Sequence, residues 1–160
     1  MWYVVNLLIV LIFFVPFLLA LYYRYEREKV LNKIKAKKGI YVPKVSVIMP
    51  FKGEDYNFKN TVKSLLVQEY EGDYELLFVT SDLQSKSIDI IKELSAKVDY
   101  VVLVRAEQNP DSSRSDKINN LLTGVKNVST DSEVLLFIDS DMVAHKKWIK
   151  NMVQPLQFPD

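Results

Sequence analysis

The chain has 160 residues, of which 49% are hydrophobic, and this suits one modest core and one folded domain. It contains no cysteine, so disulfides, thiolate metal sites and cysteine nucleophiles are excluded. The net charge of +1 at pH 7 creates no overall positive field, and nucleic acid is therefore not an expected partner.

The chain begins with an apolar run over residues 1–23, in which Asn6 is the only strongly polar side chain. A helix of roughly 20 apolar residues is long enough to cross a bilayer. Aromatic residues stand near both ends of the run, as in the interfacial belts of membrane helices. A cleavable signal peptide fits less well, because no basic residues precede the run and no small-residue cleavage site follows it. The sequence therefore predicts a transmembrane signal anchor over 1–23.

A basic segment follows the apolar run, whereas nothing basic precedes it. Seven Lys or Arg residues lie between 24 and 38: Arg24, Arg27, Lys29, Lys33, Lys35, Lys37 and Lys38. Positive charge favours the cytoplasmic side of a membrane, so we expect a single-pass membrane protein with its N-terminus outside and the rest of the chain in the cytoplasm. Residues 24–43 form a juxtamembrane linker in this interpretation. Its helical spacing fits either a helix on anionic headgroups or a solvated linker helix.

From residue 44 onward, short apolar runs alternate with amphipathic stretches, which is the pattern of strand and helix units around a parallel sheet. The predicted strands are 44–49, 74–80, 100–104 and 133–138. The predicted helices are 57–69, 85–97 and 114–127, with a last helix starting near His145. The sequence thus predicts an α/β domain over 44–160 with a mainly parallel four-stranded sheet.

Polar residues follow each predicted strand. In an open parallel sheet, ligands bind beyond the carboxyl ends of the strands. The segments in question are "PFKGED", "TSDLQS", "RAEQNPDSSRSDK" and "DSD", in chain order. We therefore expect a binding site at this edge of the sheet.

Asp139 and Asp141 directly follow the fourth predicted strand. Strand side chains alternate with a period of two, so the two carboxylates project to the same side if the extended geometry persists. Mg²⁺ and Mn²⁺ prefer such oxygen ligands and often bridge substrate phosphates. The pattern therefore favours a divalent cation bound to a diphosphate. A turn or a helix cap, which also favours Asp, is the alternative.

Two segments carry a family resemblance: "VSVIMPFKGEDYNFKNTVKSLLVQEYEGDYELLFVTSD" and "DKINNLL". They resemble the family 2 glycosyltransferases, and within them the branch of ceramide glucosyltransferases and bacterial enzymes that glycosylate hopanoid or other lipids. The similarity runs from about Val45 to Val153. It implies a Rossmann-like GT-A fold, a UDP-sugar donor, transfer of a hexose with glucose as first candidate, a lipid acceptor, and a metal ion at Asp139 and Asp141.

The resemblance also implies donor-binding residues. Asp82 matches the aspartate associated with the nucleotide base, although Thr80 and Ser81 stand where many members have an acidic pair. The remaining matches lie in the turn after the first strand and after the long loop: Lys52, Gly53, Asp55, Lys117, Asn119 and Asn120. A helix N-cap is the alternative for Asp82, and a solvated side chain is the alternative for the lysines and for Arg114.

The catalytic base of that family is an aspartate further downstream, followed by a Gln/Arg-x-x-Arg-Trp segment, and neither occurs before Asp160. The chain is therefore expected to be the donor-binding half of a glycosyltransferase. Its base would lie downstream of Asp160, on a C-terminal half that an adjacent chain could supply.

Two alternatives stay open. One is a membrane-tethered nucleotide-sugar-binding module without catalysis. The other is a nucleotidyltransferase, which would need a glycine-rich phosphate loop after the first strand.

Overall fold

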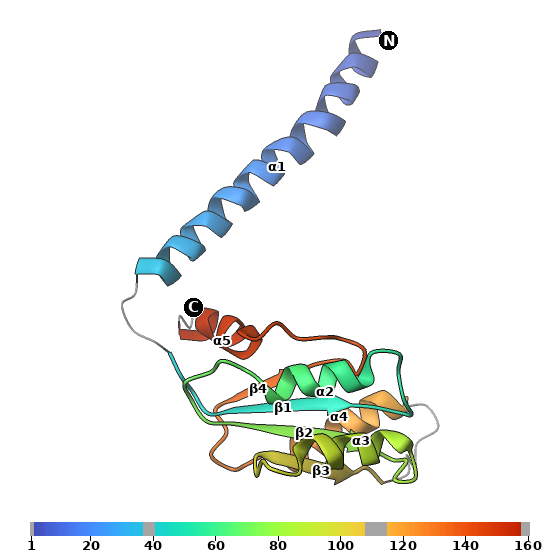
Figure 1. The fold of residues 1–160 in the computed structure, drawn as a ribbon. Helices are drawn as coiled ribbons and strands as arrows, with labels where there is room; N and C mark the ends of the chain where they lie inside the picture. Colours follow the sequence, from blue (N-terminus) through green and yellow to red (C-terminus); the bar gives the residue numbers. More distant parts are fainter. Residues whose placement is uncertain (1, 37–40, 108–114, 158–160) are drawn as a thin grey trace. The chain divides into compact units, whose positions relative to one another are not determined.

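The computed structural model describes residues 2–36, 41–107 and 115–157, except for the side chains of 4–10 and 34–36 (Figure 1). The chain divides into two compact units, Met1–Ile40 and Tyr41–Asp160. The described part of the first unit, residues 2–36, is a single long helix. The second unit contains all the strands and the candidate site.

Helix α1 (Trp2–Ala36) joins the predicted anchor and the predicted linker helix in one continuous helix with Pro16 in its interior. Over the side chains that the structure describes, no helix combines the length and the apolar content that a membrane crossing requires. The predicted transmembrane helix over 1–23 is therefore not supported by the structure.

The second unit is built on a parallel sheet, as predicted. Its strands are β1 (Val45–Pro50), β2 (Tyr74–Thr80), β3 (Val101–Arg105) and β4 (Val134–Phe137). They lie in the order β3-β2-β1-β4, and each neighbouring pair is parallel. Every strand begins and ends within one residue of its predicted position. The predicted α/β fold class with a four-stranded parallel sheet is confirmed.

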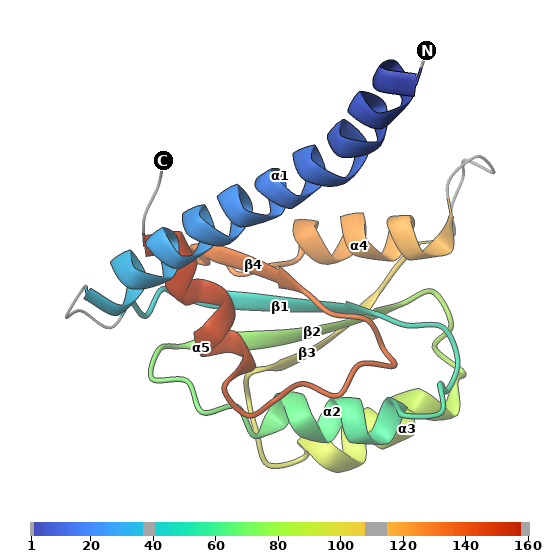
Figure 2. The ribbon, with the colours of Figure 1, turned by 90° about the horizontal axis from the view of Figure 1, so that it is seen from above.

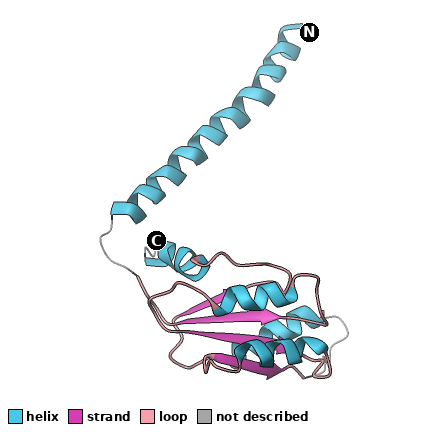
Figure 3. Ribbon diagram, in the orientation of Figure 1, coloured by secondary structure: helices cyan, strands magenta, loops and turns pink. Residues whose placement is uncertain are grey.

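The strand order determines which face each helix covers. Right-handed crossovers from β1 to β2 and from β2 to β3 place α2 (Phe58–Leu66) and α3 (Lys86–Ser95) on one face. The chain then returns to the free side of β1, so the crossover helix α4 (Asp116–Lys126) lies on the opposite face (Figures 2 and 3). The chain continues after β4 into α5 (Trp148–Val153) and a short 3₁₀ helix, Gln154–Gln157. The last helix, which was predicted to start near His145, starts at Trp148.

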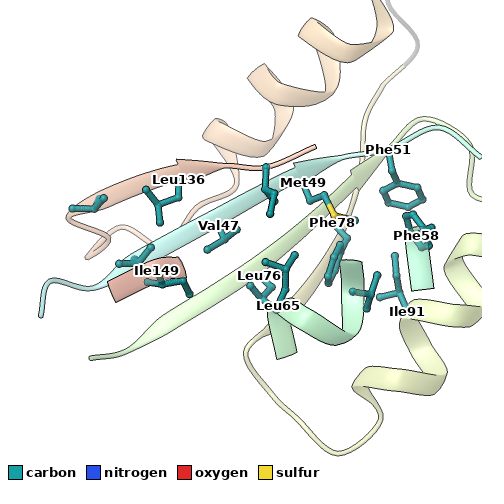
Figure 4. Packing of buried hydrophobic residues seen from close by; sticks show 14 of the residues in the cluster. Val47, Met49, Phe51, Phe58, Leu65, Leu76, Phe78, Ile91, Leu136 and Ile149 are labelled. Atoms are coloured by element: carbon teal, nitrogen blue, oxygen red, sulfur yellow. The ribbon is translucent and has the colours of Figure 1, made fainter. Parts of the chain in front are cut away.

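Hydrophobic side chains fill both faces of the sheet. The larger cluster lies between the sheet and helices α2, α3 and α5, and Figure 4 shows Val47, Leu76, Phe78 and Ile149 within it. A smaller cluster under α4 contains Ile48, Leu77, Val79, Val104 and Ala106. All six residues of β1 are buried, as expected for a central strand covered on both sides. This packing holds the carboxyl end of β1 firmly at the edge where the polar residues gather.

Candidate functional site

A pocket lies where the strand order reverses, beyond the carboxyl ends of β1 and β4. Such a reversal leaves a crevice, because the crossovers on its two sides run to opposite faces of the sheet. The pocket has a volume of about 320 Å³. It is lined by residues from the β1 turn, the start of α4 and the β4 turn: Pro50, Phe51, Lys52, Asp55, Asp116, Lys117, Asn120, Asp139, Ser140 and Asp141.

The turn after β1 contributes Lys52 and Asp55 to the pocket. Gly53 adopts a φ of +74°, a left-handed conformation that disfavours any side chain, and its carbonyl accepts a 2.6 Å hydrogen bond from the Ser87 hydroxyl. The Asp55 carboxylate accepts a hydrogen bond from the Ser140 hydroxyl. Gly53 therefore shapes the turn without lining the pocket, while Asp55 ties the β1 turn to the β4 turn.

The turn after β4 contributes Asp139, Ser140 and Asp141. The strand ends at Phe137, and the Met142 amide donates to the Asp139 carbonyl at 3.2 Å, so the chain turns here and does not remain extended. The extended geometry on which the strand-alternation argument depended therefore does not persist to these residues. Both carboxylates nevertheless line the same pocket, as predicted, because the tight turn keeps them together.

Two ion pairs cross the pocket. The Lys117 ammonium lies 2.6 Å from Oδ1 of Asp139, and the Lys52 ammonium lies 2.8 Å from Oδ2 of Asp116. The hydrogen bond to Asp116, with its negative charge, raises the pKa of Lys52, so this lysine stays charged at neutral pH. Two lysines face four aspartates among the lining residues, which leaves a net charge of −2 on the lining. The pocket therefore favours a cation.

Helix α4 brings its first turn to the pocket. The Ser115 hydroxyl accepts a 3.4 Å hydrogen bond from the Ile118 amide and caps the helix. Asn120 is 2% exposed, and its side-chain amide donates to the Phe51 carbonyl at 3.4 Å. Its Oδ1 has no hydrogen-bond partner among the described residues. Asn119 does not line the pocket, because its side chain donates to the Glu107 carbonyl at 2.8 Å.

Asp82 follows β2 but does not line the pocket. Its Oδ1 accepts a 3.1 Å hydrogen bond from the Gln84 amide, so it stabilises a local turn. The N-cap of α3 is Ser85, not Asp82. The negative charge of Asp82 still contributes to the raised pKa of Lys52, although Asp116 contributes more. The predicted contact of Asp82 with a nucleotide base stays a prediction.

The pocket thus brings together six of the nine predicted site residues and leaves Gly53, Asp82 and Asn119 outside its lining. Sequence reasoning missed Asp116 and Ser140. Both stand directly beside predicted residues, and their adjacency to Lys117 and Asp139 was the signal that could have identified them. Arg114 lies outside the described residues.

Hydrogen bonds and an ion pair join the segment after the β4 turn to the end of α2 and the residues that follow it. The Ser64 hydroxyl accepts a hydrogen bond from the Ala144 amide at 2.9 Å. The side chain of Gln68 donates to the His145 carbonyl at 3.0 Å and accepts from the Ile149 amide at 3.1 Å. An ion pair of 2.7 Å between Glu69 and Lys146 lowers the pKa of Glu69. These contacts limit the freedom of the loop that carries Asp139 and Asp141.

A divalent cation fits the chemistry of this site in part. Among the described residues, no three His, Cys, Asp or Glu side chains are grouped so as to hold a metal ion. The predicted site has two carboxylates, Asp139 and Asp141, and a Mg²⁺-type ion often takes one or two protein carboxylates while substrate phosphates and waters supply its other ligands. The negative lining suits this arrangement.

A parallel sheet covered on both faces, with an acidic pocket at the reversal of strand order, defines an α/β domain of the doubly wound class. The profile of glycosyl transferase family 21 matches residues 8–160. The chain belongs to this family.

Similar proteins agree with that assignment. The chain is 26% identical over 113 residues to the probable glycosyltransferase YdaM of Bacillus subtilis, covering 70% of this chain and 26% of that protein. The mannosyltransferase PcManGT of Pyrobaculum calidifontis, solved with GDP-Man and Mn²⁺, aligns with a TM-score of 0.60 at 20% identity over 87% of this chain and 40% of that chain. Residues 1–349 of S. aureus TarS align with a TM-score of 0.55 at 22% identity over 69% of this chain and 31% of that chain.

The resemblance to glycosyltransferases is confirmed, and both solved structures share the fold. The matching family is 21, whereas the sequence resemblance indicated family 2. The ceramide and hopanoid branch is not tested by these comparisons. The chain spans about a quarter of the length of its curated relative.

Proposed function

We propose that this chain forms the donor-binding part of a glycosyltransferase that transfers a hexose, with glucose as first candidate, from a UDP-sugar to a lipid acceptor such as ceramide or a hopanoid-type lipid. Family membership supports the transferase. The main observation that supports donor binding is the pocket where the strand order reverses, which is lined by two lysines and by the Asp139–Asp141 turn. The donor and acceptor rest on the resemblance of the β1–β2 region to lipid glycosyltransferases.

Charge supports the metal requirement. A nucleotide sugar brings a negatively charged diphosphate to a lining whose own net charge is −2. The two would repel each other in a confined site, where screening by water is reduced. In this proposal Asp139 and Asp141 hold Mg²⁺ or Mn²⁺, which supplies charge neutralisation at the phosphates. Lys52 and Lys117 supply further positive charge, and Asn120 supplies a hydrogen-bonding group.

The catalytic base is proposed to lie downstream of Asp160. An acid that acts as base must come within hydrogen-bond reach of the acceptor hydroxyl. Two acids in the β1 turn are the nearest alternatives, but Asp55 accepts a hydrogen bond from Ser140, and Glu54 does not line the pocket. We therefore expect the 160-residue chain to bind donor without transferring sugar.

Titration of the purified chain with nucleotide sugars tests the proposal. UDP-glucose and GDP-mannose are compared with and without Mn²⁺, and transfer is assayed with ceramide or a hopanoid-type lipid. We expect Mn²⁺-dependent binding of UDP-glucose. Preference for GDP-mannose would reject the UDP-sugar assignment, and the absence of binding to either would reject the donor site. Glycolipid formed by this chain, and lost in Asp139→Ala, would reject a downstream base.

Two alternatives remain. A nucleotide-sugar-binding module without catalysis would bind donor and stay inactive even when joined to its downstream segment. A nucleotidyltransferase would consume a nucleoside triphosphate and release pyrophosphate. The β1 turn disfavours the second alternative, since "PFKGED" has one glycine, Gly53, where a phosphate-cradling loop has several.

The proposed topology places the N-terminus outside and residues 44–160 in the cytoplasm. This part rests on the sequence alone, on the apolar run and the seven basic residues that follow it. Reporter fusions after residue 45 test it. Access to such a reporter from outside intact cells would overturn the proposed orientation, and a reporter released with the soluble fraction would overturn the proposed anchor.

A further inference from the structure

The Lys117–Asp139 ion pair occupies one of the two carboxylates to which the metal role is assigned. The Lys117 ammonium lies 2.6 Å from Oδ1 of Asp139, and both residues line the pocket. Asp141, by contrast, has no ion pair or side-chain hydrogen bond among the described residues. The two carboxylates of the β4 turn are therefore unequal before any ligand arrives.

An ammonium group and a divalent cation compete for the same carboxylate. Each is attracted by the negative charge of Asp139, and two positive charges this close repel each other. The side chains of Lys117 and Asp139 are 58% and 52% exposed, so the pair is held loosely and can open at small cost. Lysine carries its charge on a flexible stem and can turn to another anion in the pocket.

We propose that Lys117 is a positioning residue that holds Asp139 in the donor-free state and moves to the donor diphosphate when donor and metal bind. This inference rests on the proposed function. Lys117 lowers the affinity of the pocket for a metal ion alone, and it makes metal and donor binding mutually dependent. By linkage, the factor by which Mn²⁺ strengthens donor binding equals the factor by which donor strengthens Mn²⁺ binding.

The chain offers a matched control in Lys52. This lysine lines the same pocket and carries the same charge, but it pairs with Asp116 at 2.8 Å and not with the β4 turn. Replacing either lysine with methionine removes one positive charge from the pocket. Only Lys117→Met releases Asp139. A third variant, Lys117→Arg, keeps a cation opposite Asp139.

The test measures Mn²⁺ affinity of the purified 160-residue chain without nucleotide, by calorimetry or by the electron spin resonance of free Mn²⁺. We expect Lys117→Met to raise this affinity about fivefold, the upper range for loss of an exposed ion pair. Lys52→Met and Lys117→Arg should stay within about twofold of the unsubstituted chain. UDP-glucose affinity in saturating Mn²⁺ should fall in Lys117→Met, because a phosphate contact is lost.

Unchanged or weaker Mn²⁺ affinity in Lys117→Met would overturn the inference, as would an equal gain in Lys52→Met, which would indicate a general effect of pocket charge. Circular dichroism confirms that each variant is folded. The proposed function fails separately, if the unsubstituted chain binds no nucleotide sugar at any Mn²⁺ concentration. The metal affinities measured without nucleotide test the role of Lys117 whether or not the unsubstituted chain binds a nucleotide sugar.

Discussion

Gly124 sets how closely α4 approaches the sheet, and Gly124→Ala should move the helix that carries Lys117 and Asn120. A Cβ atom at this position would lie 2.5 Å from Cγ2 of Ile48 and 3.2 Å from Cγ2 of Val79. Both neighbours are fully buried and β-branched, so they cannot turn away without leaving their preferred rotamers. Relief must come from displacement of α4.

Two opposing free-energy contributions determine how much Gly124→Ala changes the free energy of unfolding. Overpacking a buried site costs about 1–3 kcal/mol, and a Cβ only 2.5 Å from a carbon of the buried Ile48 places Gly124→Ala in the upper part of that range, at about 2–3 kcal/mol. Alanine is better than glycine in a helix interior by about 1 kcal/mol, which offsets part of this cost. We expect a net loss of about 1–2 kcal/mol in the free energy of unfolding, and weaker donor binding because α4 no longer presents its first turn to the pocket correctly.

Urea denaturation followed by circular dichroism measures the change, with Val125→Ala as the control. Val125 is the next residue of α4 and is 38% exposed, so its truncation should change stability by no more than about 0.5 kcal/mol. If Gly124→Ala were as stable as the unsubstituted chain or more stable, α4 could not be seated against Ile48 as the structure has it, and the reasoning would be wrong.

Three further predictions concern the site and its support. Asp141→Asn should weaken Mn²⁺-dependent donor binding about tenfold or more, and unchanged binding in a calorimetric titration would exclude the carboxylate as a metal ligand. Gln68→Leu should destabilise the protein by about 1–3 kcal/mol in urea denaturation, because two hydrogen bonds, to the His145 carbonyl and from the Ile149 amide, are lost. Burial raises the pKa of Tyr70 from 10.0 to about 12, so stability should fall as pH rises from about 10 towards 12, and Tyr70→Phe should reduce this alkaline loss.

The strands could be predicted closely because their sequences allow little else. Each is a short apolar run rich in Val, Ile, Leu, Phe or Tyr and bounded by polar residues, and the central strand β1 is buried along its whole length. The pattern also implied parallel strands with their carboxyl ends at one edge. Six predicted site residues therefore line one pocket.

Helix ends were predicted less well, because distant contacts decide them. The predicted helix over 57–69 ends at Leu66, three residues early. Gln68 is occupied with the backbone of the segment leading into α5, and the Glu69 amide donates to the Lys146 carbonyl at 2.6 Å. Amphipathic spacing cannot reveal such contacts, since their partners lie almost 80 residues away in the chain.

The state of Asp139 could not be predicted from its motif, because it depends on strand order. The four apolar runs indicate parallel strands but do not say that β4 returns to the free side of β1. That return places α4 on the face opposite α2 and α3, and it brings the first turn of α4 to the pocket beside the β4 turn. Lys117 thereby meets Asp139, while Lys52 meets Asp116. The ion pair of Asp139 therefore follows from sheet topology as much as from the Asp-Ser-Asp sequence.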